Sequence, residues 1–218
     1  MGRVLPIAIL LSGEGTTFDS IAEAIAGGHL PARIVVVVSD RPHAHGIERA
    51  RYRGLPTAVR PLHGVAAADW ARDVGALLTD RGAELVVLAG FLGILPREFL
   101  VPWRGRVINV HPSLLPKFGG PGMYGRHVHE AVLAARSTES GASIHVVTEE
   151  VDGGPVLLQE KVPVEPGDTS ESLQDRIRPV ERRLLADAIR RFADGEWPLP
   201  YDASGKVSPS REPGGRSP

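Results

Sequence analysis

The stretch Val107-Ile108-Asn109-Val110-His111-Pro112-Ser113-Leu114-Leu115-Pro116 decides how the chain folds. Its first half is apolar and β-branched, which is typical of a strand buried on both faces of a parallel sheet. Asn109 and His111 are two residues apart, so on a strand their side chains leave from the same face. Pro112 and Pro116 then fix the backbone where the strand ends. We therefore expect an amide and an imidazole side by side at the end of a buried strand.

An amide and an imidazole in this position can donate hydrogen bonds to an oxygen that becomes anionic during a reaction. The alternative is a polar pair that only satisfies a turn. A short Asn-x-His pattern does not by itself decide between these two interpretations, so the rest of the sequence has to be considered.

The composition limits the classes of protein to consider. The 218 residues carry a net charge of −1, with 42% hydrophobic and 23% charged residues and no cysteine. This excludes disulfides and cysteine nucleophiles and gives no sign of a nucleic-acid or membrane surface. No apolar run approaches the roughly 20 residues that span a bilayer, and the first residues do not resemble a secretion signal. We expect a soluble cytoplasmic protein, monomeric or homodimeric, that binds neither nucleic acid nor a membrane.

Apolar runs alternate with helical patterns along most of the chain. Buried strands are predicted at 4–11, 34–38, 85–90 and 107–110, and helices at 16–27, 46–52, 66–78, 127–136 and 170–192. A short strand is predicted at 56–59, and two more at 142–147 and 156–164, the last of them antiparallel. This pattern predicts an α/β fold, with a doubly wound, mostly parallel, Rossmann-like sheet covered by helices on both faces. We expect one domain over 1–195 and a partly disordered tail over 196–218, disordered from Lys206 onward.

A glycine loop, Ser12-Gly13-Glu14-Gly15-Thr16-Thr17, follows the first strand and opens a helix. This layout directs backbone N–H groups and the helix dipole at a phosphate, while Thr16 and Thr17 add hydroxyl donors or cap the helix. Phe18 stands where a dinucleotide-binding loop has its third glycine, and the lysine of a P-loop is absent. A phosphate on a small substrate fits better than either, and a plain tight turn is the alternative.

Two further loops and a turn follow strands of the predicted sheet. The apolar segment 91–96 could line a pocket for a flat ring or pack under the next helix. The glycine-rich segment 118–125 could act as a lid. Two glycines after Asp152 mark a sharp turn, which could hold its carboxylate against a cleft or be capped by it. Ligands of doubly wound sheets bind beyond the carboxyl ends of the strands, where these segments could meet.

Four segments give the chain a resemblance to a known family. They are LSGEGTT at 11–17, VLAGF at 87–91, NVHPSLLP at 109–116 and VDGGPV at 151–156. In this order and at these distances they resemble the phosphoribosylglycinamide formyltransferases, the folate-dependent formyltransferases of purine synthesis. The resemblance runs from about residue 4 to residue 192.

The resemblance implies transfer of a formyl group from 10-formyltetrahydrofolate, a co-substrate, to the amine of glycinamide ribonucleotide, without a metal. Asn109 and His111 would polarise the formyl oxygen, and Asp152 would keep His111 cationic and relay a proton through water. Because an opposite charge favours the imidazolium, we expect the pKa of His111 to be raised. The N-terminal half would bind the ribonucleotide phosphate, and the C-terminal half would complete the folate pocket.

The resemblance also implies two sets of binding residues. The ribonucleotide would contact Gly15, Thr16, Thr17, Arg178 and Glu181. The folate would contact Asn109 and Asp152 together with Leu92, Gly93, Ile94, Leu95, Thr148, Glu149, Glu150 and Val151.

The chain departs from the family pattern in several places. Gly93 replaces an arginine that many members place near the folate's glutamate tail, so anchoring of that tail is open. Thr17 replaces a common asparagine, Arg178 a common glutamine, and the segment 118–124 is longer than usual. The alternatives are a formyltetrahydrofolate hydrolase, a methionyl-tRNA formyltransferase, which would carry a C-terminal tRNA-binding domain, and a non-enzymatic nucleotide-binding module.

Overall fold

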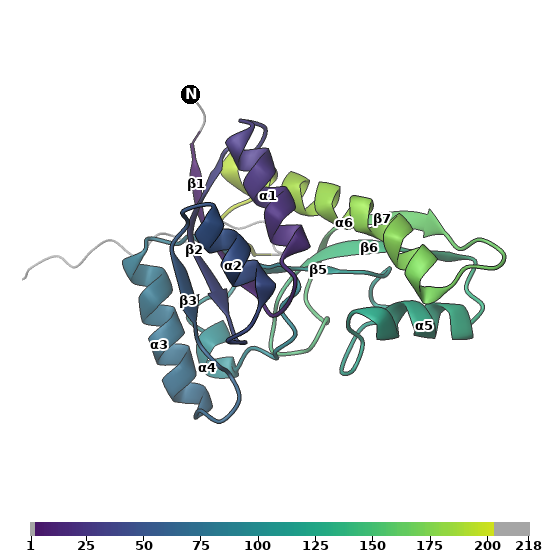
Figure 1. Ribbon diagram of the computed structural model, residues 1–218, viewed down its shortest axis with the longest axis horizontal. Helices are drawn as coiled ribbons and strands as arrows, with labels where there is room; N and C mark the ends of the chain where they lie inside the picture. The colour runs from purple at the N-terminus through teal and green to yellow at the C-terminus, as the bar shows by residue number, and fades with distance from the viewer. Residues whose placement is uncertain (1–2, 203–218) are drawn as a thin grey trace, which may run out of the picture.

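The structure, a computed structural model, describes residues 3–202. Within them, seven strands form one sheet in the order β3-β2-β1-β4-β5-β6-β7 (Figure 1). The strands are β1 (Leu5–Leu11), β2 (Ala32–Ser39), β3 (Thr57–Val59), β4 (Leu85–Leu88), β5 (Val107–His111), β6 (Glu139–Val146) and β7 (Val156–Pro163). The first five strands of this order run parallel, β6 is antiparallel to β5, and β7 is antiparallel to β6. The predicted fold class and the antiparallel direction of the last strand are confirmed.

Helices cover both faces of the sheet. They are α1 (Thr16–Ala26), α2 (His45–Tyr52), α3 (Ala67–Asp80), α4 (Arg97–Leu100), α5 (Arg126–Ala134) and α6 (Ser170–Ala193). Buried side chains of α1, α2 and α6 form one core with the sheet, and those of α3 and α4 form a second core on its other face. The five predicted helices are present, with ends shifted by at most a few residues. The one-turn helix α4 was not predicted.

The long helix α6 begins with a capping box. The Thr169 hydroxyl accepts from the Ser172 backbone N–H (3.2 Å), and the Ser172 hydroxyl accepts from the Thr169 backbone N–H (2.9 Å). Helix α1 begins differently, because its N-cap is Gly15 with a φ of 75° and no side-chain cap. The expectation that Thr16 or Thr17 might cap α1 is therefore wrong, and the first N–H groups of α1 lack a side-chain cap.

The order of the sheet reverses between β1 and β4, and the loops after these two strands are tied together. The Ser12 N–H donates to the Gly90 carbonyl (3.0 Å), and the Leu92 N–H donates to the Ser12 hydroxyl (2.8 Å). Such a topological switch point is where doubly wound sheets bind ligands. The glycine loop and the apolar loop therefore reach one place through the sheet itself.

The chain beyond α6 packs on the domain as far as it is described. The Trp197 ring lies edge-on to Phe192, with centroids 5.1 Å apart, and the Tyr201 N–H donates to the Gly105 carbonyl (2.7 Å). The start of the predicted tail thus packs on the folded unit, and the part predicted to be disordered, from Lys206, lies outside the described residues. Among residues 3–202, no helix is long and apolar enough to cross a membrane.

Gly154 tests how tightly the turn after Asp152 is built. A Cβ added at Gly154 would lie 1.8 Å from the Val146 carbonyl oxygen, whereas one at Gly13 would meet no atom within 4 Å. We expect Gly154→Ala to lower the free energy of unfolding by about 2 kcal/mol or more, and Gly13→Ala to leave it nearly unchanged. Urea denaturation of both variants measures this, and equal stabilities would contradict it.

Candidate active site

A cavity of about 300 Å³ lies beyond the carboxyl ends of β4 and β5. Its walls are the apolar loop after β4, the end of β5, the glycine-rich segment 120–125, the turn at 147–152 and part of α6. Most of the predicted site residues line it: Thr17, Leu92, Gly93, Ile94, Leu95, Asn109, His111, Thr148, Glu149, Val151, Asp152 and Glu181. The predicted residues Gly15, Thr16, Glu150 and Arg178 do not line this cavity.

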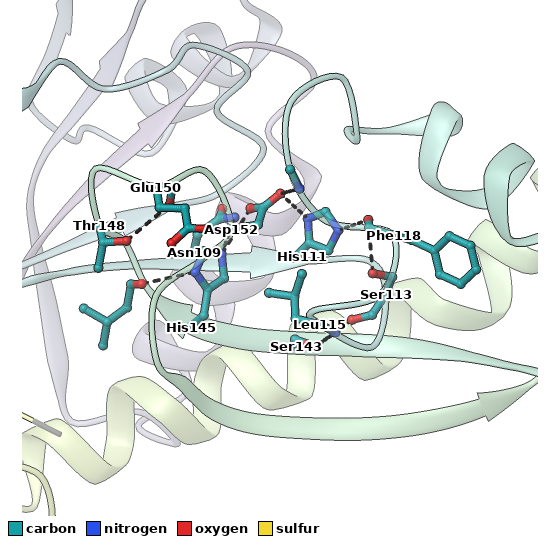
Figure 2. Close-up of polar contacts among 12 residues, drawn as sticks. Asn109, His111, Ser113, Leu115, Phe118, Ser143, His145, Thr148, Glu150 and Asp152 are labelled. Carbon is teal, nitrogen blue, oxygen red and sulfur yellow. Dashed lines mark hydrogen bonds and ion pairs between the residues drawn. The ribbon is translucent and has the colours of Figure 1, made fainter.

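The Asp152 carboxylate lies between two buried imidazoles (Figure 2). Asp152 Oδ2 is 3.5 Å from His111 Nδ1, and Oδ1 is 3.5 Å from His145 Nε2. The Gly120 backbone N–H donates to Oδ2 at 2.9 Å. Asp152 has a left-handed φ of 56°, which turns its side chain toward the cavity. The carboxylate therefore bridges three segments and does not cap its own turn.

Sequence analysis did not identify His145 as a site residue. It lies on β6, opposite Asn109 in the antiparallel register with β5, and is 2% exposed. The Asn109 amide nitrogen lies 3.1 Å from His145 Nε2, and His145 Nδ1 donates to the Val146 carbonyl at 3.2 Å. His145 thus fixes how the Asn109 amide is turned, and leaves its second N–H free. The available signal was one imidazole in the predicted strand 142–147, whose other residues are apolar apart from Ser143.

The Pro-flanked turn after β5 holds the ring of His111. His111 Nε2 donates to the Phe118 carbonyl at 2.8 Å, and the Ser113 hydroxyl donates to the Lys117 carbonyl at 2.8 Å. In a neutral ring whose hydrogen is on Nε2, the Nδ1 lone pair faces Asp152. A proton added at Nδ1 would therefore lie between the ring and a carboxylate.

The charge state of this cluster differs from the expectation. Burial is the largest influence on His111 and lowers its pKa, although Asp152 and the Phe118 carbonyl act to raise it. The expected rise in the pKa of His111 is therefore wrong, because loss of solvation outweighs the attraction of the carboxylate. Burial also acts to raise the pKa of Asp152, but His145, His111 and the Gly120 N–H together hold it below its ordinary value. A neutral imidazole beside a carboxylate results at neutral pH.

The end of the cavity near α1 and α6 is polar. Thr17 of α1 and Gln174 and Glu181 of α6 line it, and burial raises the pKa of Glu181 to about 7 against the effect of nearby arginines. Arg178 donates to Asp175 on the surface of α6 (2.8 Å). Gly15 lies against α2, since a Cβ there would be 2.5 Å from the Gly46 Cα.

The structure gives a reason for Gly93. A Cβ at this position would lie 2.8 Å from the Leu62 side chain and 3.0 Å from the Phe91 ring. A longer side chain would have to displace both. In this chain the nearest arginine along the same segment is Arg97, which bonds Glu149 (2.9 Å).

Comparison with known proteins gives the family. A family model described as formyl transferase matches residues 5–189, which is most of the chain and contains the whole cavity. The chain belongs to the formyl transferase family. Each of the four segments on which the resemblance rests contributes to the lining of this formyl transferase cavity, together with the loops 92–95, 120–125 and 147–149 and with α5 and α6.

Named relatives agree with the family. The phosphoribosylglycinamide formyltransferase of Haemophilus influenzae is 37% identical over 196 residues, which cover 88% of this chain and 89% of the relative. The trifunctional purine biosynthetic protein adenosine-3 of Bos taurus is 36% identical over 192 residues, 87% of this chain but 18% of that relative. The crystal structure of glycinamide ribonucleotide transformylase 1 from Symbiobacterium toebii matches with a TM-score of 0.83 and 36% identity, covering 89% of this chain and 90% of that one. These matches confirm the predicted resemblance.

The pKa of His111 tests the electrostatics of this formyl transferase. The Asp152 charge is the largest influence that raises this pKa, so Asp152→Asn should lower it further. NMR titration of the His111 ring measures the shift. Glu149→Gln is the matched control, because the Glu149 carboxylate bonds Arg97 and is not among the groups that shift the His111 pKa, so the titration should stay unchanged. A constant or higher His111 pKa in Asp152→Asn would contradict the assignment.

Two buried groups should make stability depend on pH in opposite directions. Burial lowers the pKa of His129 to about 4, so the folded state loses stability as pH falls from about 6.5 toward 4. Because the pKa of Glu181 is raised, the folded state also loses stability as pH rises from about 4.5 toward 7. Relative to the unaltered protein, the free energy of unfolding should therefore rise most at pH 4.5 for His129→Leu and most at pH 7 for Glu181→Gln. Urea midpoints at both pH values check this, and offsets that do not change with pH would refute it.

Proposed function

We propose that this formyl transferase transfers the formyl group of 10-formyltetrahydrofolate to the amine of glycinamide ribonucleotide, in purine biosynthesis. The products are formylglycinamide ribonucleotide and tetrahydrofolate. One observation carries the proposal: the Asn109, His111 and Asp152 side chains and the apolar loop 92–95 line one cavity. An apolar wall suits a flat pterin ring, and the polar cluster suits a reacting carbonyl.

The reaction needs an anion to be stabilised. The ribonucleotide amine attacks the formyl carbon, a C–N bond forms, and the formyl oxygen becomes an oxyanion. The Asn109 N–H that His145 leaves free is the donor for this oxygen. One preorganised donor of this kind is worth roughly 100- to 1,000-fold in kcat.

The reaction also moves one proton. The attacking amine must lose a proton, and the departing folate nitrogen must gain one, so the balance is zero. The neutral His111 ring, with Nδ1 facing Asp152, takes the proton up and becomes an imidazolium held by the carboxylate. The positive charge of the imidazolium then favours the oxyanion, and the proton returns through water to the folate nitrogen.

The N-terminal half supplies the phosphate end of the ribonucleotide site. Gly15, Thr16 and Thr17 lie where α1 begins without a side-chain cap, so the N–H groups of its first turn are available to an anion. Thr17 and Glu181 line the cavity together, and the Arg178 charge, three residues before Glu181 on α6, acts on this carboxyl group. The turn 148–152 and the loop 92–95 enclose the folate from the opposite side.

The test is formyl transfer by the purified protein, with and without glycinamide ribonucleotide. We expect turnover only with the ribonucleotide. Asn109→Ala and His111→Ala should each lower kcat by roughly 100-fold or more, and His63→Ala, which changes an exposed histidine away from the cavity, should not.

Each other result has a definite meaning. Loss of the formyl group without ribonucleotide would indicate a hydrolase. The absence of turnover with either substrate set would overturn the proposal. Near-normal turnover in folded Asn109→Ala would overturn the role of the amide while leaving the reaction itself in place.

A further inference from the structure

His129 is a buried imidazole that the mechanism above does not use. It lies on α5, is 1% exposed, and lines the same cavity as His111 and Asp152. Among residues 3–202, no group hydrogen-bonds its Nδ1 atom. Buried polar groups almost always have a partner, and one left without it costs free energy. The protein alone therefore gives no reason for an imidazole at this position.

Packing does not require a histidine here. The neighbouring buried positions on α5 are Val128 and Val132, which are fully enclosed and purely apolar. A leucine at 129 would continue that apolar face without an unpaired nitrogen. The polar ring is thus explained by something outside the protein that contacts it in the cavity.

The charge at this position favours an uncharged partner. Burial, with smaller effects from Arg178 and His111, lowers the pKa of His129 to about 4, so the ring is neutral at neutral pH. A neutral imidazole offers one donor and one acceptor, which matches a hydroxyl group. It offers no positive charge to a phosphate or a carboxylate.

The other polar side chains at this end of the cavity have the same character. Thr17 offers a hydroxyl, Gln174 an amide, and Glu181 a carboxyl group whose pKa burial raises to about 7. The nearest cation, Arg178, is turned toward Asp175 and does not line the cavity. Together these side chains suit the hydroxyls of a sugar, while the phosphate would lie at the uncapped N–H groups where α1 begins.

We propose that His129 is a substrate-binding residue that hydrogen-bonds a hydroxyl of the ribonucleotide's sugar, beside Gln174 and Glu181. This inference rests on the proposed function, because it names a contact of the same substrate. It assigns to α5 a part in recognising the acceptor, while the folate contacts lie on other elements.

The experiment is a pair of binding titrations on His129→Leu. We expect the Kd for glycinamide ribonucleotide to rise about tenfold, while the Kd for tetrahydrofolate and the Kd for inorganic phosphate stay within about twofold. kcat at saturating ribonucleotide should change little while KM rises. His127→Leu is the matched control, since it makes the same change at an exposed position of the same helix and should alter none of these constants.

A second measurement needs no substitution. In the unaltered protein, the His129 ring-nitrogen resonances should shift when glycinamide ribonucleotide is added and stay fixed when inorganic phosphate is added. This readout also covers the case in which His129→Leu fails to fold.

The outcomes separate this inference from the proposed function. If the unaltered protein transfers the formyl group and His129→Leu binds the ribonucleotide as tightly as the unaltered protein, the inference is overturned and the function stands. An equal loss for both substrates would show a structural role for His129 and would also overturn it. If the unaltered protein does not use glycinamide ribonucleotide at all, the proposed function falls, and this inference with it.

Discussion

The contact of one carboxylate with two buried imidazoles is the constraint on which the site depends. Asp152 reaches His111 on β5 and His145 on β6 at 3.5 Å each, and the Gly120 N–H holds it from a third side. Three segments far apart in the chain meet at this group. The tight turn at Gly153 and Gly154 positions this carboxylate. Position 154 requires a glycine, because a Cβ there would collide with the Val146 carbonyl oxygen. Burial keeps the neighbouring ring neutral, and the carboxylate makes that ring ready to accept a proton.

Much of the fold and part of the site can be predicted because the signals are local. The apolar runs of β1, β2, β4 and β5 indicate buried parallel strands without reference to the rest of the chain. The spacing of Asn109 and His111 places both on one face of a strand, and two glycines after Asp152 predict a sharp turn. These predictions use only short-range backbone geometry, and the structure contains the strands, the Asn109/His111 pair and the turn that they describe.

The rest depends on which segments come together. His145 belongs to the site only because the antiparallel register of β6 places it opposite Asn109. His129 is buried only because α5 packs under α6, and an amphipathic pattern does not tell a core histidine from a ligand. The pKa of His111 was predicted in the wrong direction because the sequence shows the neighbouring charge and not the degree of burial. The N-cap of α1 also depends on a contact between distant segments. Gly15 takes a left-handed conformation where it lies close against Gly46, and the sequence does not show that contact.

The direction of β6 has a consequence for how the enzyme can change. The chain leaves the sheet after His111, forms the segment 112–138, and returns on the adjacent strand in the opposite direction. The pairing of Asn109 with His145 is set by the ladder between β5 and β6, so residues can be inserted or removed near 121–125, beyond the contact of the Gly120 N–H with Asp152, without disturbing it. The wall of the cavity that this segment forms can thus be reshaped by changes in loop length while Asn109 and His145 keep their positions. In this fold, the loop that shapes the cavity and the strands that hold the Asn109/His145 pair can therefore change independently during evolution.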